Sequence, residues 1–541
     1  MGARFLVSLF YYIDGGQISL KVNIFDSTLR DGAQAEGISF LVTDKIKITK
    51  ALDELGIDFI EAGNPGSNQK DLEFFKEAKK LNLKHSKLVA FGSTRRCNSD
   101  VFTDFNVNAL LEANTDYVCI FGKSWDFHVE NIINTTKEEN LKMIYDTISY
   151  LKGKNKHVFF DAEHFFDGFK ANRKYAIETL ICARDAGAEC LILCDTNGGC
   201  FPDEIMEIVD YVKNKVNIPI GIHAHNDSGM AVANSVVAVL KGCSQVQGTF
   251  LGYGERCGNA NLSAIIANLE LKREYSCLPC GGIKNLTSVA KKIAEISNFK
   301  LEENMPYVGD SAFAHKAGMH IDGVYKNSKS FEHISPESVG NERKFLISEV
   351  SGKSTVLAKI NKIYPNIEKN DSRLNSIISI IKDLEFKGYQ FEGADASFEL
   401  IVHKTLNNFI PFFEVENFKT IGEGPSVENI FSASAIIKVI VNDEEEVTAA
   451  NGNGPVDALN KALRKAIGRF YPVLNEVYLS DYKVRILDGK ESATAAKTRV
   501  IIESTDGQNT WSTVGVSKDI IEASFKALID SIEYKLFKEN N

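Results

Sequence analysis

Eight short apolar runs alternate with amphipathic stretches between residues 22 and 272, at a spacing of about 30 residues. Runs of this length are typical of strands buried on both faces, and the stretches between them have the periodicity of helices. Repetition of one βα unit over about 250 residues predicts a (β/α)₈ TIM barrel, an α/β fold. The runs cover residues 22–25, 59–62, 88–91, 117–121, 158–160, 190–194, 218–222 and 244–249.

A doubly wound open sheet is the alternative arrangement for alternating strands and helices. Polar motifs follow the first, fifth, sixth, seventh and eighth apolar runs. An open sheet would gather its site at one switch point, whereas a barrel brings the carboxyl ends of all its strands to one mouth. The distribution of the polar motifs around the whole circuit therefore favours the barrel.

Two of the intervening helices have recognisable ends. Ile46, Leu52 and Leu55 share one helical face, and Gly56 follows the last of them. Pro202 precedes a second periodic segment. Glycine is preferred after the last helical residue and proline in the first turn, so we expect helices over both segments.

A chain of 541 residues is too long for one ordinary core, so we expect two or three domains. We assign residues 20–275 to the catalytic barrel, 276–390 to mainly helical linker subdomains and 391–541 to a regulatory or dimerisation domain. The last segment alternates like strands and then like a helix, twice over, which predicts an α+β domain of two βββα units. The predicted elements are strands at 398–402 and 436–441 with a helix at 458–467, then strands at 482–487, 498–503 and 511–516 with a helix at 520–532.

Composition limits the classes of partner. The net charge of −10 argues against nucleic acid or an anionic membrane surface, because both attract basic proteins. The ten cysteines lack the density of a secreted disulfide scaffold. The apolar segment 5–13 resembles a signal peptide only faintly, since no small-residue cleavage site follows it. We expect an N-terminal extension and a cytoplasmic protein.

Two histidines separated by one residue lie at the end of the seventh apolar run. In a strand, His223 and His225 point to the same face and their imidazoles converge, while Ile220, Ile222 and Ala224 point to the other face and pack against helices. Paired imidazoles followed by polar residues suggest a site for a divalent metal. The alternative is two packed or surface histidines without a ligand.

The other strand ends add chemically related groups. They are the segments 26–34 (DSTLRDGAQ), 161–164 (DAEH), 195–199 (DTNGG) and 252–259 (GYGERCGN). Each motif is weak by itself. Together, and in this order on successive strand ends, they are specific.

These motifs resemble those of the metal-dependent acyl-CoA condensing enzymes of the DRE-TIM metallolyase superfamily. The group contains 2-isopropylmalate, homocitrate and citramalate synthases, and the resemblance extends along nearly the whole chain. The chain is most similar to the citramalate synthases, through residues 27–34, 61–66, 161–168 and 314–320.

The resemblance implies that Asp31, His223 and His225 bind one divalent cation, with Asn259 as a weaker or water-mediated ligand. One carboxylate and two imidazoles leave coordination positions open, as a catalytic site requires, and they accept Mg²⁺, Mn²⁺, Co²⁺ or Zn²⁺. Asp26 has the same residue type but does not match the family's ligand, so we expect a structural role for it.

The resemblance also implies the roles of the remaining site residues. Arg30, Thr196 and Gln34 would bind the 2-oxo acid, and Arg30 would also stabilise the negative charge that grows on its keto oxygen. Acetyl-CoA must lose a methyl proton to become a nucleophile, and Glu163 and His320 are the candidates for that base. Water then cleaves the thioester.

The family places the His320 segment over the active site of the neighbouring subunit, which implies a homodimer with exchanged subdomains. The chain has Phe331 where the family usually has a tyrosine, although Tyr325 lies nearby in sequence. The glycine-rich segment 451–455 and Gly515 resemble the branched-chain amino acid effector domain. Glycine-rich turns before helices are often only caps. Isoleucine is the expected effector.

The expected reaction joins pyruvate to acetyl-CoA and water, giving citramalate and CoA for isoleucine biosynthesis. A 2-isopropylmalate synthase, which uses 2-oxoisovalerate, is the nearest alternative, and we expect Phe91, Phe121 and Phe160 to set the pocket volume that decides between them. A hydroxymethylglutaryl-CoA lyase is a second alternative, favoured only by Cys257 in the loop after the eighth strand. A non-catalytic amino-acid sensor would have lost metal residues, and none is lost.

Overall fold

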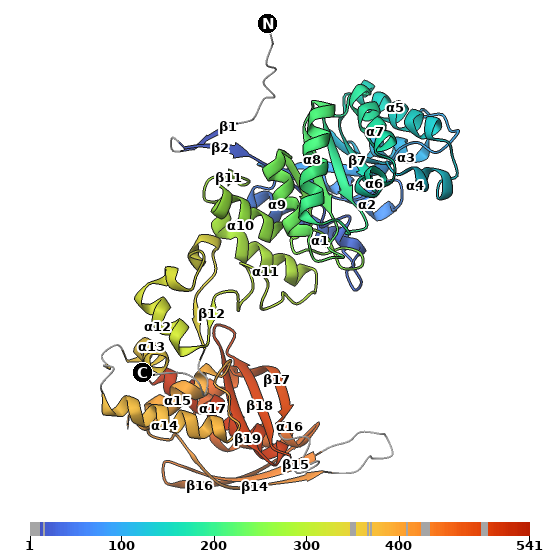
Figure 1. Cartoon of the computed structure of the whole chain (residues 1–541). Coiled ribbons are helices and arrows are strands. Elements are labelled where there is room, and N and C mark those ends of the chain that lie inside the picture. Colours follow the sequence, from blue (N-terminus) through green and yellow to red (C-terminus); the bar gives the residue numbers. More distant parts are fainter. Residues whose placement is uncertain are drawn as a thin grey trace. The chain divides into compact units, whose positions relative to one another are not determined.

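The computed structural model of the chain describes residues 11–14, 17–346, 353–364, 367, 371–406, 409–422, 433–487 and 496–540. Eight parallel strands close into a barrel in the order β10-β3-β4-β5-β6-β7-β8-β9. In Figure 1 the barrel strand β7 is drawn among the labelled helices of this part of the chain, which is coloured blue to green. The predicted barrel is confirmed, and each predicted run falls on one of its strands. The strands are β3 (Asn23–Asp26), β4 (Phe59–Glu61), β5 (Lys87–Ser93), β6 (Tyr117–Lys123), β7 (His157–Glu163), β8 (Cys190–Asp195), β9 (Ile220–Ala224) and β10 (Gln245–Gly248).

A helix follows each barrel strand along the chain. Short helices α4 (Asp126–Asn131) and α6 (Phe165–Ala171) are inserted after β6 and β7, and α11 (Leu286–Ile296) packs against α1. The crossover helices are α1 (Val42–Leu55), α2 (Gln69–Ala78), α3 (Phe105–Ala113), α5 (Lys137–Gly153), α7 (Arg173–Asp185), α8 (Pro202–Val216), α9 (Ala231–Lys241) and α10 (Leu262–Arg273).

The two helices predicted from their ends are confirmed. Helix α1 ends at Leu55, and Gly56 has a φ of 97°, a left-handed conformation that glycine adopts without steric cost. Helix α8 begins at Pro202, and the Glu204 carboxylate accepts a hydrogen bond of 2.9 Å from the backbone N–H of Phe201. That bond satisfies one of the donors that a helix start leaves unpaired.

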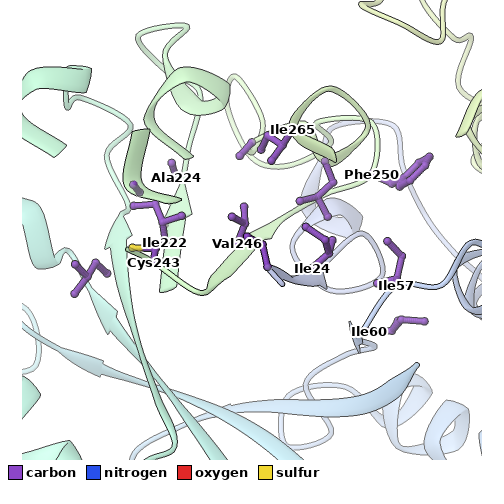
Figure 2. Close-up of a cluster of buried hydrophobic side chains, with 14 of the residues drawn as sticks. Ile24, Ile57, Ile60, Ile222, Ala224, Cys243, Val246, Phe250 and Ile265 are labelled. Atoms are coloured by element: carbon purple, nitrogen blue, oxygen red, sulfur yellow. The ribbon is translucent and has the colours of Figure 1, made fainter. Parts of the chain in front are cut away.

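Side chains alternate between the two faces of each barrel strand. Ile222 and Ala224 of β9 belong to a buried aliphatic cluster that also contains Val246 of β10 and Ile265 of α10 (Figure 2). This is the predicted packing of one face of β9 against helices. His223 lies between Ile222 and Ala224 in the strand and therefore points to the opposite face.

A second apolar cluster fills part of the barrel interior. Phe159 belongs to it, with its ring centroid 6.1 Å from that of Phe25. Phe160, the next residue, belongs to the outer cluster instead. The prediction that Phe160 lines the acceptor pocket is therefore wrong, because one step along a strand moves a side chain to the other face. The interior cluster comprises Phe25, Val89, Phe91, Cys119, Phe159, Cys190, Ile192 and Cys194, with Phe59, Tyr117 and Phe121 against it.

Part of the N-terminal extension forms a small sheet. Residues 5–10 of the apolar segment lie outside the described residues, while β1 (Tyr11–Asp14) pairs antiparallel with β2 (Gln17–Lys21). Strand β11 (Tyr275–Ser276) pairs parallel with β2. Lys21 Nζ donates to Asp58 Oδ2 at 2.9 Å and to the carbonyl of Cys277 at 2.6 Å. Among the helices that the structure describes, none has the length and hydropathy needed to cross a bilayer.

The chain divides into two compact units. The first extends to Phe313 and includes residues 334–342, and the second comprises residues 314–333 and 343–541. Glu332 of the second unit is paired with both Arg343, at 2.6 Å, and His315 Nε2, at 3.1 Å.

Short 3₁₀ helices occur in both units. They are η1 (Gly32–Gln34), η2 (Gly282–Asn285), η3 (Ser328–Ser330), η4 (Pro336–Val339) and η5 (Pro472–Glu476). The first part of the second unit contains β12 (Ala314–His315), α12 (Gly318–Lys326), β13 (Lys344–Phe345), α13 (Lys353–Ile363) and α14 (Ser372–Phe386).

The C-terminal part has the predicted pair of βββα units. Each unit is a three-stranded antiparallel sheet followed by a helix, with its centre strand alternating between buried and more exposed residues. The first contains β14 (Glu414–Gly422), β15 (Ala433–Val441), β16 (Glu444–Gly452) and α16 (Pro455–Ile467). The second contains β17 (Tyr478–Ile486), β18 (Thr498–Thr505), β19 (Thr510–Ser517) and α17 (Ile520–Glu539).

One predicted strand of this region is wrong. Residues 398–402 lie within helix α15 (Asp395–Thr405), which packs against β19 and α17. Phe398, Leu400 and Val402 are all buried, because the helix is covered on several sides. A short apolar run has the same appearance in a buried helix and in a buried strand, so periodicity cannot separate the two.

Two glycines of the C-terminal units face the helices. A Cβ added to Gly452, at the end of β16, would collide with the backbone nitrogen of Ala458 in α16. A Cβ added to Gly515, in β19, would collide with the carbonyl oxygen of Ala523 in α17. Both glycines therefore allow a helix to approach its own sheet closely.

The change Gly515→Ala should lower the free energy of unfolding of this region by about 1–3 kcal/mol, because the added methyl group overpacks the contact between β19 and α17. Gly454→Ala is the matched control, since nothing lies within 4 Å of a Cβ at that position. Urea unfolding followed by the fluorescence of Trp511, in β19, measures both changes when Trp125, the other tryptophan of the chain, is replaced by phenylalanine. Equal unfolding midpoints would contradict the packing role.

Candidate metal centre and active site

Asp31, His223 and His225 meet at the carboxyl ends of the first and seventh barrel strands. Asp31 follows β3 in the turn before η1, His223 lies in β9, and His225 follows that strand. All three side chains are buried, and one ligand atom of each lies within 4.8 Å of the others. Over the described ranges, no other group of three or more His, Cys, Asp or Glu residues has this arrangement.

The three groups perturb one another's charge. Burial alone would raise the pKa of Asp31, but the charge of Arg30 and the imidazole of His223 outweigh burial and hold that pKa well below its usual range. His223 Nε2 lies 3.4 Å from Asp31 Oδ2. Burial, with the neighbouring His223, lowers the pKa of His225 to about 4, so His225 is neutral at physiological pH. Burial alone would lower the pKa of His223, but the hydrogen bond and the charge of Asp31 outweigh burial and raise that pKa. Metal binding requires an ionised carboxylate and neutral imidazoles, so a cation would displace the proton of His223.

Two buried polar atoms beside this group have no hydrogen-bond partner. They are Nδ1 of His225 and Oδ1 of Asn259. An isolated β-bridge pairs His225 with Asn259, and Asn259 Nδ2 donates to the carbonyl of Tyr253 at 3.3 Å. Buried polar atoms are rarely left unpaired, and nitrogen and oxygen donors of these types suit a divalent cation. The residues present therefore fit a metal ion.

Asp26, the other acid of the first strand end, has a different environment. Its two oxygens accept hydrogen bonds from the backbone N–H and the hydroxyl of Thr28, both at 2.9 Å. Complete burial raises the pKa of Asp26 to about 7. These bonds shape the turn that leads to Asp31, in line with the structural role expected for Asp26.

Arg30 is fixed between two carboxylates and an aromatic ring. Its Nε donates to Glu61 Oε2 at 2.7 Å, and its Nη1 lies 3.2 Å from Asp31 Oδ2. Its guanidinium carbon lies 3.8 Å from the centroid of the Phe91 ring, and Phe91 stacks on Phe121 with centroids 5.4 Å apart. The guanidinium is therefore a fixed positive charge beside the candidate metal ligands.

Sequence reasoning missed the role of Glu61. This carboxylate is fully buried at the end of β4 and accepts from the Ser27 hydroxyl at 2.5 Å as well as from Arg30. A buried carboxylate needs such partners. An acidic residue at the end of an apolar run was the available signal.

Glu163 and Thr196 lie at the ends of β7 and β8. Glu163 forms an ion pair with Lys123, whose position at the end of β6 is in register with it. Lys123 is a second residue that sequence reasoning missed. The Thr196 hydroxyl accepts a hydrogen bond of 2.9 Å from the backbone N–H of His164, which has a left-handed φ of 56°. Non-glycine residues in this conformation are concentrated at functional sites.

Gln34 and His320 are the other two residues predicted for the site. Gln34 is exposed, and its backbone N–H donates to the carbonyl of Asp31 at 3.0 Å. His320 belongs to the second compact unit, where it is exposed on α12 and stacks on Phe331 with ring centroids 4.2 Å apart. Phe331, the residue that replaces the family's tyrosine, thus packs against the imidazole ring of His320. Tyr325 is two-thirds exposed.

The loop after β10 is attached to two neighbouring strand ends. Arg256 donates to Asp227 Oδ1 at 2.9 Å and to the carbonyl of Thr196 at 2.8 Å. Cys257 is the next residue and is exposed. An exposed thiol beside the mouth is the feature on which the lyase alternative depended.

Comparison with known proteins covers nearly the whole chain. The HMGL-like family matches residues 21–298, a homocitrate synthase post-HMGL domain-like family matches 307–388, and the LeuA allosteric (dimerisation) domain matches 392–536. An (R)-citramalate synthase of Aquifex aeolicus is 50% identical over 520 residues, which are 96% of this chain and 98% of that one.

Two further relatives show where the similarity is strongest. An (R)-citramalate synthase of Geobacter sulfurreducens is 49% identical over 517 residues, 96% of this chain and 98% of its own. A 2-isopropylmalate synthase of Methanocaldococcus jannaschii is 32% identical over 522 residues, 96% of this chain and 95% of its own. The chain, which joins an HMGL-like region to a LeuA allosteric (dimerisation) domain, belongs to the family of the (R)-citramalate synthases.

Proposed function

We propose that this chain condenses acetyl-CoA with pyruvate and hydrolyses the thioester, giving (R)-citramalate and CoA on the route to isoleucine. The observation that supports this activity most directly is that the buried side chains of Asp31, His223 and His225 lie together beside the Arg30 guanidinium. Identity of 49–50% to (R)-citramalate synthases against 32% to a 2-isopropylmalate synthase favours pyruvate over 2-oxoisovalerate as the acceptor.

Asp31, His223 and His225 would hold the divalent cation, with the unpartnered Oδ1 of Asn259 as a further donor. Such an ion, when bound, polarises the keto group of a chelating 2-oxo acid. We assign Mg²⁺, Mn²⁺, Co²⁺ or Zn²⁺ to the site, because its nitrogen and oxygen donors accept all four.

Arg30 and Thr196 are the residues that orient the acceptor. Arg30 is held rigidly by Glu61, so its remaining N–H groups can donate to the oxygen that becomes negative as the new bond forms. The Thr196 hydroxyl has donor capacity left after accepting from His164, which suits the acceptor carboxylate. Gln34, at the exposed end of η1, completes the proposed substrate contacts.

Glu163 is the proposed base of the barrel. It takes a proton from the acetyl methyl group, the resulting carbon attacks the keto carbon of pyruvate, and the keto oxygen gains a proton. Water then attacks the thioester carbonyl, releasing CoA as a thiol and leaving a carboxylate. His320 is the proposed second acid–base group, supplied by the partner subunit of a homodimer. Its stacking on Phe331 restricts the orientation of its ring.

The remaining proposals concern organisation and control. Residues 20–275 form the catalytic domain, 276–390 the linker subdomains and 391–541 the regulatory and dimerisation domain. Isoleucine is the proposed effector of the last domain, supported by the LeuA allosteric match at residues 392–536. The cytoplasm is the proposed location of the protein.

Adding pyruvate to the enzyme with acetyl-CoA and Mn²⁺ should release free thiol, measured with a thiol reagent. The rate with 2-oxoisovalerate should be lower, and a chelator should abolish thiol release until metal is restored. Asp31→Asn should fail to recover at ordinary Mn²⁺ concentrations, because the charged ligand is lost. Absence of thiol release with every 2-oxo acid would favour the amino-acid sensor instead.

Replacing Phe91 with leucine should enlarge the pocket beside Arg30 and shift kcat/KM toward 2-oxoisovalerate. The expected shift corresponds to about 1–3 kcal/mol, the range for small apolar differences in a pocket. Phe160→Leu is the matched control, since Phe160 faces the outer cluster and should change stability without changing the ratio of the two acceptors. Equal ratios in both variants would remove Phe91 from the specificity pocket.

Two inactive variants should complement each other if active sites combine residues of two subunits. Co-expression of Glu163→Gln with His320→Ala should restore about a quarter of wild-type activity, because half of the dimers are mixed and each has one intact site. Each variant expressed alone is the control. No recovery in dimers shown to be mixed would mean that both residues act within one subunit.

A further inference from the structure

A chain of buried polar side chains extends from His223 away from the other metal ligands. His223 Nδ1 lies 2.9 Å from Gln247 Oε1, on the neighbouring strand β10. Gln247 Nε2 donates to Asp161 Oδ1, on β7, at 3.0 Å. The thiol of Cys119, on β6, donates to the same Asp161 oxygen at 3.1 Å. All four side chains are buried in the barrel interior.

Asp161 determines which way the Gln247 amide faces. A carboxylate only accepts hydrogen bonds, so the NH₂ group of Gln247 must point to Asp161 and its carbonyl oxygen to His223. The Cys119 thiol occupies the same side of Asp161 as a second donor, which favours the accepting form of the carboxyl group. A reversed amide would place its oxygen against the Asp161 carboxylate, and the hydrogen bond between Gln247 and Asp161 would be lost.

The orientation of Gln247 in turn determines the state of His223. An amide oxygen at 2.9 Å can only accept, so Nδ1 of His223 carries a hydrogen, and in the neutral ring Nε2 then presents its lone pair. Nε2 is the nitrogen that faces Asp31, at 3.4 Å. The tautomer selected inside the barrel is therefore the one that can bind a cation together with Asp31.

We infer that Gln247 is a positioning residue of the metal centre, which fixes the tautomer and ring orientation of His223, and that Asp161 holds Gln247 in the required orientation. This inference rests on the proposed metal centre and adds two residues to it. Gln247 itself does not touch the cation, and its effect passes through His223. Outer partners of metal-bound histidines typically change metal affinity by about 10–100-fold.

The same strand offers a matched control. Gln245 lies two residues before Gln247 on β10, is equally buried and has the same side chain, but its Nε2 has no hydrogen-bond partner. Gln247→Met and Gln245→Met therefore remove the same groups from the same strand. Only the first change removes the acceptor of His223.

The test is the affinity of the full-length chain for Co²⁺, measured by titrating the metal-free protein and following the visible absorption of the bound ion. Gln247→Met should raise the Kd about 10–100-fold and Gln245→Met should leave it within about twofold of wild type. Failure of the wild-type protein to bind Co²⁺ would contradict the proposed metal centre itself. Normal wild-type binding with equal Kd values in the two variants would contradict only the role of Gln247.

A double substitution tests the direction of the hydrogen bonds and does not depend on the methionine variant folding. Gln247→Glu alone places a second carboxylate against Asp161, and binding should weaken. Asp161→Asn combined with Gln247→Glu supplies a donor at 161 and an acceptor at 247, so the Kd should return to within about threefold of wild type. A double variant that binds Co²⁺ as weakly as Gln247→Glu alone, while its melting temperature matches wild type, would overturn the inference.

Discussion

The barrel buries Asp31, Glu61 and Asp161 around a single guanidinium, that of Arg30. Uncompensated negative charge in a buried site is costly, so one cation for three carboxylates is an incomplete balance. Burial and the neighbouring Glu61 raise the pKa of Asp161 to about 6, so this group is still mostly ionised at neutral pH and the imbalance of charge persists. The imbalance lies beside His223, in β9, and His225, which follows that strand, and a divalent cation would compensate for it there.

The same alternation that gathers these charges also stabilises the fold around them. Every second residue of a barrel strand faces the interior, and the residues between them face the helices. In β9 this sends His223 inward and both Ile222 and Ala224 outward into the aliphatic cluster. Aromatic rings such as Phe25 and Phe159 fill another part of the interior. Because helices cover the outer face, the strands can place polar groups inside without losing their apolar packing.

The sequence was informative where a pattern repeats, and uninformative where one residue acts alone. The spacing of the apolar runs predicted the barrel, and the two histidines at i and i+2 predicted their own convergence. Glu61, Lys123 and Gln247 are single polar residues in or next to apolar runs, and only the closed barrel shows what they face. The misplacement of Phe160 has a related cause, since membership of a strand does not by itself say which face a residue occupies.

The C-terminal domain shows how a motif can have a packing explanation. The glycine-rich segment 451–455 and Gly515 resembled parts of an effector site, yet Gly452 and Gly515 face the helix of their own βββα units. In each unit a helix lies close to its three-stranded sheet, and in each unit a glycine of the sheet leaves room for the helix backbone. Packing thus accounts for these two glycines without any ligand. Packing does not account for Gly454 of the same segment, because nothing lies within 4 Å of an added Cβ there.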